Sequence, residues 1–98
     1  MLESLTAATF EPHRDTDFAV QVDGEEARLR LVEVRAYPHQ PRAPRTDPFS
    51  LQFVGPAQPA LDQRIHRLEH PDLGVVELFL VPTGLVPGGQ RRYEAVFN

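Results

Sequence analysis

Apolar and polar residues alternate over short stretches along most of the chain, and this pattern predicts strands rather than helices. The clearest stretch is a hairpin, with a strand from Ile65 to His70, a turn over Pro71–Gly74 and a strand from Val75 to Val81. Proline presets the φ angle that a turn needs, and glycine accepts a backbone conformation that other residues resist. The second strand has large apolar residues at both sets of alternate positions, which predicts a central strand covered on both faces.

Four further strands are predicted around this hairpin. A strand over 17–22 and a strand over 26–37 flank Asp23-Gly24, a pair typical of hairpin turns. The apolar phase of the second strand shifts from Leu29 and Leu31 to Val32 and Val34, which predicts a bulge or a bend. The other two strands are expected at 49–54 and 91–97. Their predicted inward residues are Phe49, Leu51, Phe53, Tyr93, Ala95 and Phe97.

The segments outside the strands are expected to contain little regular secondary structure. Residues 4–9 predict one helical turn, capped by Ser4 or Thr6, and Pro12 is expected to end any helix. Leu5 and Phe10 would anchor this turn to the core. Residues 57–63 and 83–90 are predicted loops, and Leu61 is the large apolar residue of the first.

Together these elements indicate an all-β fold: a small, mainly antiparallel, six-stranded barrel or sandwich with a short N-terminal helical turn. The 98 residues fit one β-domain spanning 1–98, with the strands expected in meander order. Closing the barrel would remove strand edges that otherwise invite association, whereas an open barrel would offer those edges to a partner.

Composition narrows the classes of function. The chain has no cysteine, which excludes disulfides, thiolate metal sites and thiol catalysis. The net charge is −4, and this acidic balance argues against general nucleic-acid binding. The first residues show no signal-peptide pattern, and no stretch approaches the ~18 apolar residues of a membrane span. We therefore expect a cytoplasmic protein with no nucleic-acid or membrane partner.

The most distinctive motif, His66-Arg67-Leu68-Glu69-His70, matches the H-x-x-E-H pattern of some zinc peptidases. Those residues lie on a helix, whereas this motif lies on a predicted strand. At a strand rise of ~3.3 Å per residue, the two histidines would lie roughly 13 Å apart. Zinc needs both nitrogens within ~2.1 Å, so one ion cannot bridge them. No metal ligand or cofactor is predicted.

The sequence also shows no recognisable set of catalytic residues. The carboxylates are scattered, and sequence separation gives no support to a dyad of Ser50 and His66. Sequence motifs for nucleophile elbows, dinucleotides and phosphate loops are absent. The protein is therefore predicted not to be an enzyme.

The proline-rich connection over 38–48 is the candidate contact segment. Its residues Pro38, Pro41, Arg42, Pro44 and Arg45 combine the three-residue spacing of polyproline II with two positive charges. The segment could dock into an aromatic groove, or it could simply stiffen a long connection.

The other arginines are predicted to lie mainly on solvated surfaces. Arg28, Arg30 and Arg35 are expected on the solvated face of a strand, although a patch for an acidic partner is the alternative. Arg91 and Arg92, next to a glycine pair, could recruit an anion.

Four segments resemble a family of short bacterial proteins of unknown function: LTAATFEPH, PFSLQFVGP, LDQRIHRLEHPDLGVVELFLVP and YEAVFN. The resemblance spans nearly the whole chain and departs from the family in the loops over 38–48 and 83–90. It implies no catalytic role for Ser50, His66 or His70. Because such proteins occur alongside phage-tail-like and tail-collar proteins, it implies a small accessory or assembly component.

The expected function is therefore non-enzymatic, through protein–protein contacts with another protein or a second copy of the chain, in a phage-tail-like or fibre structure. The alternative is a small-ligand-binding barrel. Its interior would have to stay open although Phe18, Phe49, Leu51, Phe53, Phe79 and Phe97 are expected to fill it. A pocket would then depend on small inward residues, Ala19 or Ala95.

Overall fold

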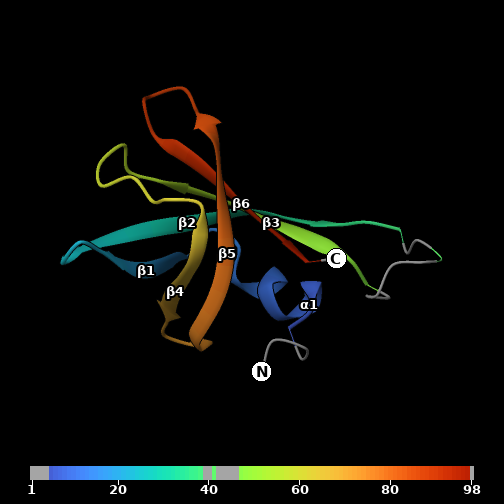
Figure 1. Cartoon of the computed structure of the whole chain (residues 1–98). Helices are drawn as coiled ribbons and strands as arrows, with labels where there is room; N and C mark the ends of the chain where they lie inside the picture. The colour runs from blue at the N-terminus through green and yellow to red at the C-terminus, as the bar shows by residue number, and fades with distance from the viewer. Residues whose placement is uncertain (1–4, 39–40, 42–46, 98) are drawn as a thin grey trace.

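The computed structural model describes residues 5–38, 41 and 47–97. Six antiparallel strands close into a barrel, preceded by a short helical segment (Figure 1). The strands are β1 Asp17–Val22, β2 Glu25–Ala36, β3 Phe49–Gly55, β4 Arg64–His70, β5 Gly74–Leu85 and β6 Arg91–Phe97. The six-stranded all-β prediction is confirmed, and of the two architectures the structure adopts the barrel.

The order of strands around the barrel is β1-β2-β3-β6-β5-β4, so the predicted meander order is wrong. β3 pairs with β6, and β4 lies on the other side, between β5 and β1. The connection over 56–63 carries the chain from β3 across to β4. Leu61 in this connection is buried, and its N–H donates a 2.9 Å hydrogen bond to the Tyr93 hydroxyl on β6. This anchor holds the crossover against the barrel.

Alternate residues of the strands point into the barrel and form one core. Phe18 of β1 and Phe53 of β3 meet edge to face, with ring centroids 5.4 Å apart. Among the described residues, the largest fully buried side chains are Phe10, Phe18, Leu29, Leu31, Phe49, Phe53, Leu51, Leu68, Leu80, Tyr93 and Ser50. The predicted inward faces of β1, β3 and β6 are confirmed, with Phe97 partly buried against the core.

The strand covered on both faces is β3, not β5 as predicted. On β5 only one set of alternate residues is buried, and Phe79, expected in the core, is 50% exposed on the outer face. On β3, Ser50 and Gln52 are buried as well as the apolar residues between them. Polar partners explain this: Ser50 bonds the Tyr37 hydroxyl at 3.0 Å, and the Gln52 amide donates to Glu94 at 2.8 Å.

Both long strands, β2 and β5, contain a shift of register. β2 contains the expected irregularity, since its register against β3 shifts between Leu31 and Glu33. β5 continues to Leu85, four residues beyond the predicted end, into the segment expected to be a loop. A second register shift, between Pro82 and Gly84, lets the proline fit into this extension.

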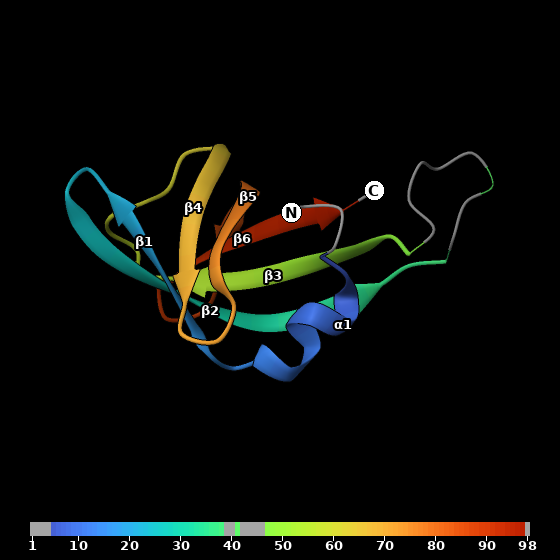
Figure 2. The ribbon, with the colours of Figure 1, turned by 90° about the horizontal axis from the view of Figure 1, so that it is seen from below.

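The N-terminal helix α1 spans Ala7–Phe10, and Thr6 is its N-cap. Thr6 and Thr9 form a reciprocal capping box, which confirms Thr6 as the predicted cap. Pro12 does not end the helical segment, because it lies in the first turn of a 3₁₀ helix, η2 Glu11–His13, where its missing N–H costs nothing. Phe10 is fully buried, 6.1 Å from the ring of Phe49. The short helices are thus fastened to one end of the barrel (Figure 2).

Candidate functional site

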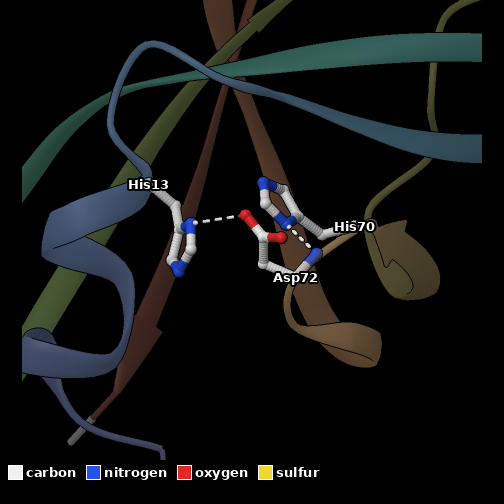
Figure 3. Close-up of side chains that lie close together, drawn as sticks. All are labelled: His13, His70 and Asp72. Atoms are coloured by element: carbon white, nitrogen blue, oxygen red, sulfur yellow. Dashed lines mark hydrogen bonds and ion pairs between the residues drawn. The ribbon is translucent and has the colours of Figure 1, made fainter.

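Three side chains with metal-ligand chemistry meet where η2 approaches the turn between β4 and β5. His13 comes from η2, His70 ends β4, and Asp72 lies in the turn (Figure 3). One ligand atom from each residue lies within 4.8 Å of the others, and His13 Nδ1 is 3.9 Å from Asp72 Oδ2. The imidazoles of His13 and His70 contact edge to face, with centroids 4.7 Å apart. We call this group the His–His–Asp cluster.

Hydrogen bonds fix the tautomer of His70. The Thr16 hydroxyl donates to the carbonyl of His13 at 2.5 Å, so it must accept its 3.0 Å bond from His70 Nε2–H. The Nδ1 of His70 in turn accepts the N–H of Asp72 at 3.0 Å. The imidazole is therefore neutral in this network, with the Nδ1 lone pair on the side of the cluster.

Burial and the neighbouring His13 both lower the pKa of His70. The side chain is buried, in contact with the ring of Phe18 at 4.6 Å between centroids. Burial lowers the pKa of His70, and the neighbouring His13 lowers it further, while the carboxylate of Asp72 opposes both. The neutral form that the hydrogen bonds require is thus also the form that the surroundings favour.

The residues of the H-x-x-E-H motif lie on β4, as predicted, and its two histidines have different surroundings. His66 Nε2 bonds the carbonyl of Asp62 at 2.7 Å, whereas His70 belongs to the His–His–Asp cluster. Ser50 bonds Tyr37, so the structure does not join Ser50 and His66 in a dyad.

A second feature is the seam where β1 meets β4. Within these two described strands, the register comprises Ala19–Glu69 and Val20–Leu68, against six or seven pairs in β1–β2, β4–β5 and β3–β6. Beyond these pairs the strands diverge (Figure 2). A hollow of about 390 Å³ lies there. Its lining is Ala19, Val20, Gln21, Arg64, Ile65, His66, Arg67 and Glu69.

Apolar side chains lie on the outer face beside this seam. Ile65 on β4 is directly opposite Phe79 on β5, and they are 65% and 50% exposed. Val75 on the same face of β5 is 46% exposed. We call Ile65, Val75 and Phe79 the β4–β5 strip. Arg67 and Glu77, opposite each other between its members, keep the strip partly polar.

The arginines are mostly on the solvated surface, as predicted. Arg28, Arg30 and Arg35 are exposed and lie within 4.0 Å of a carboxylate on β1 or β2. Arg91 Nε donates to the carbonyl of Ala57, so it braces the crossover connection. Arg92 lines a separate hollow with Arg30, at the end of the barrel near the β5–β6 turn.

The predicted contact segment is described in part. Pro38 and Pro41 are exposed, and Tyr37 N–H donates to the carbonyl of Pro48 at 2.9 Å, which closes the base of the connection. Arg42, Pro44 and Arg45 lie outside the described residues.

Comparison with known proteins places the chain in a family. The family DUF6916, a domain of unknown function, matches residues 5–97. The chain belongs to this family. No curated protein and no solved structure matches it. Membership of DUF6916 confirms the resemblance to a domain-of-unknown-function family. In the described part of the chain, no helix has the length and apolar character to cross a membrane.

Sequence reasoning placed Asp72 and His70 near one turn but missed His13. The two histidines come together because the turn over 13–16 is fastened to β2: Asp15 N–H donates to Leu31 O at 2.7 Å, and Leu31 N–H donates to Thr16 O at 3.1 Å. No local pattern in the sequence of this DUF6916 member signals that contact. The weak β1–β4 seam likewise follows from the strand order.

Proposed function

We propose that this DUF6916 domain is a non-enzymatic protein-contact module that binds an extended segment of a partner protein at the β1–β4 seam and the β4–β5 strip. The observation that carries the proposal is the position of Ile65. This residue lies on the stretch of β4 that has left β1, lines the hollow at the seam, and pairs with the exposed ring of Phe79.

Strand addition explains why these features lie together. Over 64–67, β4 is paired with β5 along one edge, while its pairing with β1 begins at Leu68. A strand edge of this kind can take up main-chain hydrogen bonds from an extended peptide, and neighbouring side chains then select the sequence. Ile65 and Phe79 would contact apolar side chains of the partner.

Charge at the seam defines the partner further. Arg64 and Arg67 line the hollow together with Glu69, which is paired with Ala19 of β1. An extended segment with an apolar residue and a nearby carboxylate fits this lining best, because the guanidinium groups pair with carboxylates. We place this contact in a phage-tail-like or fibre assembly, on the family resemblance of the sequence, with the segment over 38–45 as an additional contact.

A small ligand inside the barrel has less support. The interior is occupied by large side chains such as Phe18, Phe53 and Tyr93, which are fully buried, and Ala19 lines outer hollows instead of the core.

The test uses the tagged full chain expressed in its own host, crosslinked gently, purified and analysed by mass spectrometry. Wild type should recover a recurrent structural protein, and the variant I65S/F79S should lose it. L85S is the matched control, because Leu85 is also 65% exposed on β5 but about 20 Å along the strand from Phe79.

Each outcome is decisive for the contact surface. Loss of the partner with I65S/F79S but not with L85S supports the seam, provided that the variant keeps the wild-type circular dichroism spectrum. Loss with R42S/R45S alone would move the contact to the 38–45 segment. Recovery of no partner, together with a monomeric native mass, would overturn the proposal.

A further inference from the structure

The His–His–Asp cluster is built from two parts of the chain that are far apart in sequence. One imidazole comes from η2, the other comes from the end of β4, and the carboxylate comes from the β4–β5 turn. Two imidazoles and a carboxylate are the donor set that zinc and similar divalent transition metals take in proteins.

Thr16 gives the cluster a feature of metal sites. Histidines that bind metals usually donate their second ring N–H to an oxygen, which fixes the tautomer and aims the free nitrogen at the ion. His70 Nε2–H donates to the Thr16 hydroxyl, and this leaves Nδ1 on the side of Asp72. The same hydroxyl donates to the carbonyl of His13 and so ties both histidines to one residue.

We propose that His13, His70 and Asp72 bind one divalent transition-metal ion of the zinc class, and that this ion fastens the N-terminal helical segment to the β4–β5 turn. This departs from the expectation, drawn from the sequence, that the chain holds no metal. The inference does not depend on the protein contact proposed above.

The three ligand atoms must move closer together to hold an ion. Zinc ligand atoms lie ~2.0–2.2 Å from the metal, so neighbouring ligand atoms of a tetrahedral set are about 3.4 Å apart. The ligand atoms of the cluster are within 4.8 Å of one another, with 3.9 Å between His13 and Asp72, and these separations must shorten. Asp72 can supply this movement, because its side chain is 73% exposed. The ion would replace the Asp72 N–H as the partner of His70 Nδ1, and water would complete a tetrahedral set.

The experiment uses the untagged full chain, treated with chelator and then titrated with Zn²⁺ by calorimetry at neutral pH. Binding of Co²⁺ is followed in parallel through its visible absorption, which is strong for four-coordinate ions and weak for six-coordinate ones. Wild type should bind one ion per chain and give the four-coordinate spectrum.

Variants separate this site from surface binding. H13Q and D72N each remove one donor from the edge of the barrel and should weaken Zn²⁺ binding by more than tenfold. T16V keeps all three donors and should weaken binding by about 10- to 100-fold, as expected for an outer-shell partner. D23N, which changes an exposed turn aspartate elsewhere, and H39Q should bind as wild type does.

Several results would overturn the proposal. These are the absence of binding by wild type, binding that H13Q and D72N leave unchanged, and loss of binding in H39Q. A six-coordinate Co²⁺ spectrum that is the same in wild type and D72N would also overturn it. Circular dichroism of each variant excludes unfolding as the cause of lost binding.

Discussion

The hydroxyl of Tyr93 accepts a hydrogen bond from the backbone N–H of Leu61, 32 positions earlier in the chain, and both residues are buried. This bond joins β6 to the connection that carries the chain from β3 to β4. The crossover is what departs from a simple meander, so a single side chain on β6 helps to set the strand order.

Replacing Tyr93 with phenylalanine should therefore destabilise the protein by about 1–3 kcal/mol, because the buried Leu61 N–H loses its partner. Urea denaturation of Y93F measures this. T83V is the control, since the Thr83 hydroxyl bonds the carbonyl of Arg92 on the exposed surface and its loss should cost within ~0.5 kcal/mol. Equal stability of Y93F and wild type would contradict the anchoring role.

Gly55 at the end of β3 is required by close packing. A Cβ atom there would lie 2.4 Å from Leu29 Cδ2, and Leu29 is fully buried. G55A should cost about 1–3 kcal/mol, the range of an overpacked core. In a double-mutant cycle, L29A should relieve most of this cost, because it removes the clashing methyl group. Strictly additive effects in the cycle would show that the clash is not the cause.

The free energy of unfolding should decrease as the pH is lowered, because of His70. Its pKa is lowered in the folded state, by burial first and by His13 second, from an ordinary value of 6.5. Below pH ~6.5 the unfolded chain therefore binds a proton that the folded chain resists, and stability decreases until the pH falls below the folded pKa, where it levels off. The titratable and charged groups facing this site are His13 and Asp72 in the cluster, with Asp17, Arg28 and Glu69 along the adjoining hollow.

Urea midpoints measured with chelator present, from pH 8 to pH 5, should show this decrease in wild type. H70N should reduce it, because an asparagine carbonyl can still accept the Asp72 N–H but does not titrate. A pH profile of H70N that matches wild type would assign the effect to other groups.

Local patterns predicted the strands but not their arrangement. The alternation over 17–22 and 91–97 fixed both strand bounds, because each strand has one buried face. The apolar run of β5 predicted burial on both faces, but β5 is part of the wall of a closed barrel, and Phe79 lies on its solvent-exposed outer face. Burial on both faces occurs instead on β3, through hydrogen bonds of Ser50 and Gln52 that no periodicity reports.

The candidate site shows the same limit. The turn over 71–74 could be recognised from proline and glycine, and it brings Asp72 back to His70. The arrival of His13 depends on backbone bonds between the 13–16 turn and Leu31, which are contacts between distant parts of the chain. The strand order decides which residues form the β1–β4 seam. The predicted meander order does not pair β1 with β4, so it could not predict the seam.

The seam itself makes a prediction about backbone protection. β3 is paired along its length with β2 on one side and β6 on the other, so its amides, such as those of Leu51 and Phe53, should exchange with solvent most slowly. On β4, the amides over 64–67 that point away from β5 lie beyond the pairing with β1. These amides should exchange as fast as loop amides, because local protection depends on hydrogen bonds and burial.

Hydrogen exchange followed by NMR resolves the two sets residue by residue. Slow exchange of the seam-facing amides in the isolated chain would mean that this edge is already paired and closed to an added strand. Fast exchange that becomes slow when a partner segment binds would locate the added strand on β4.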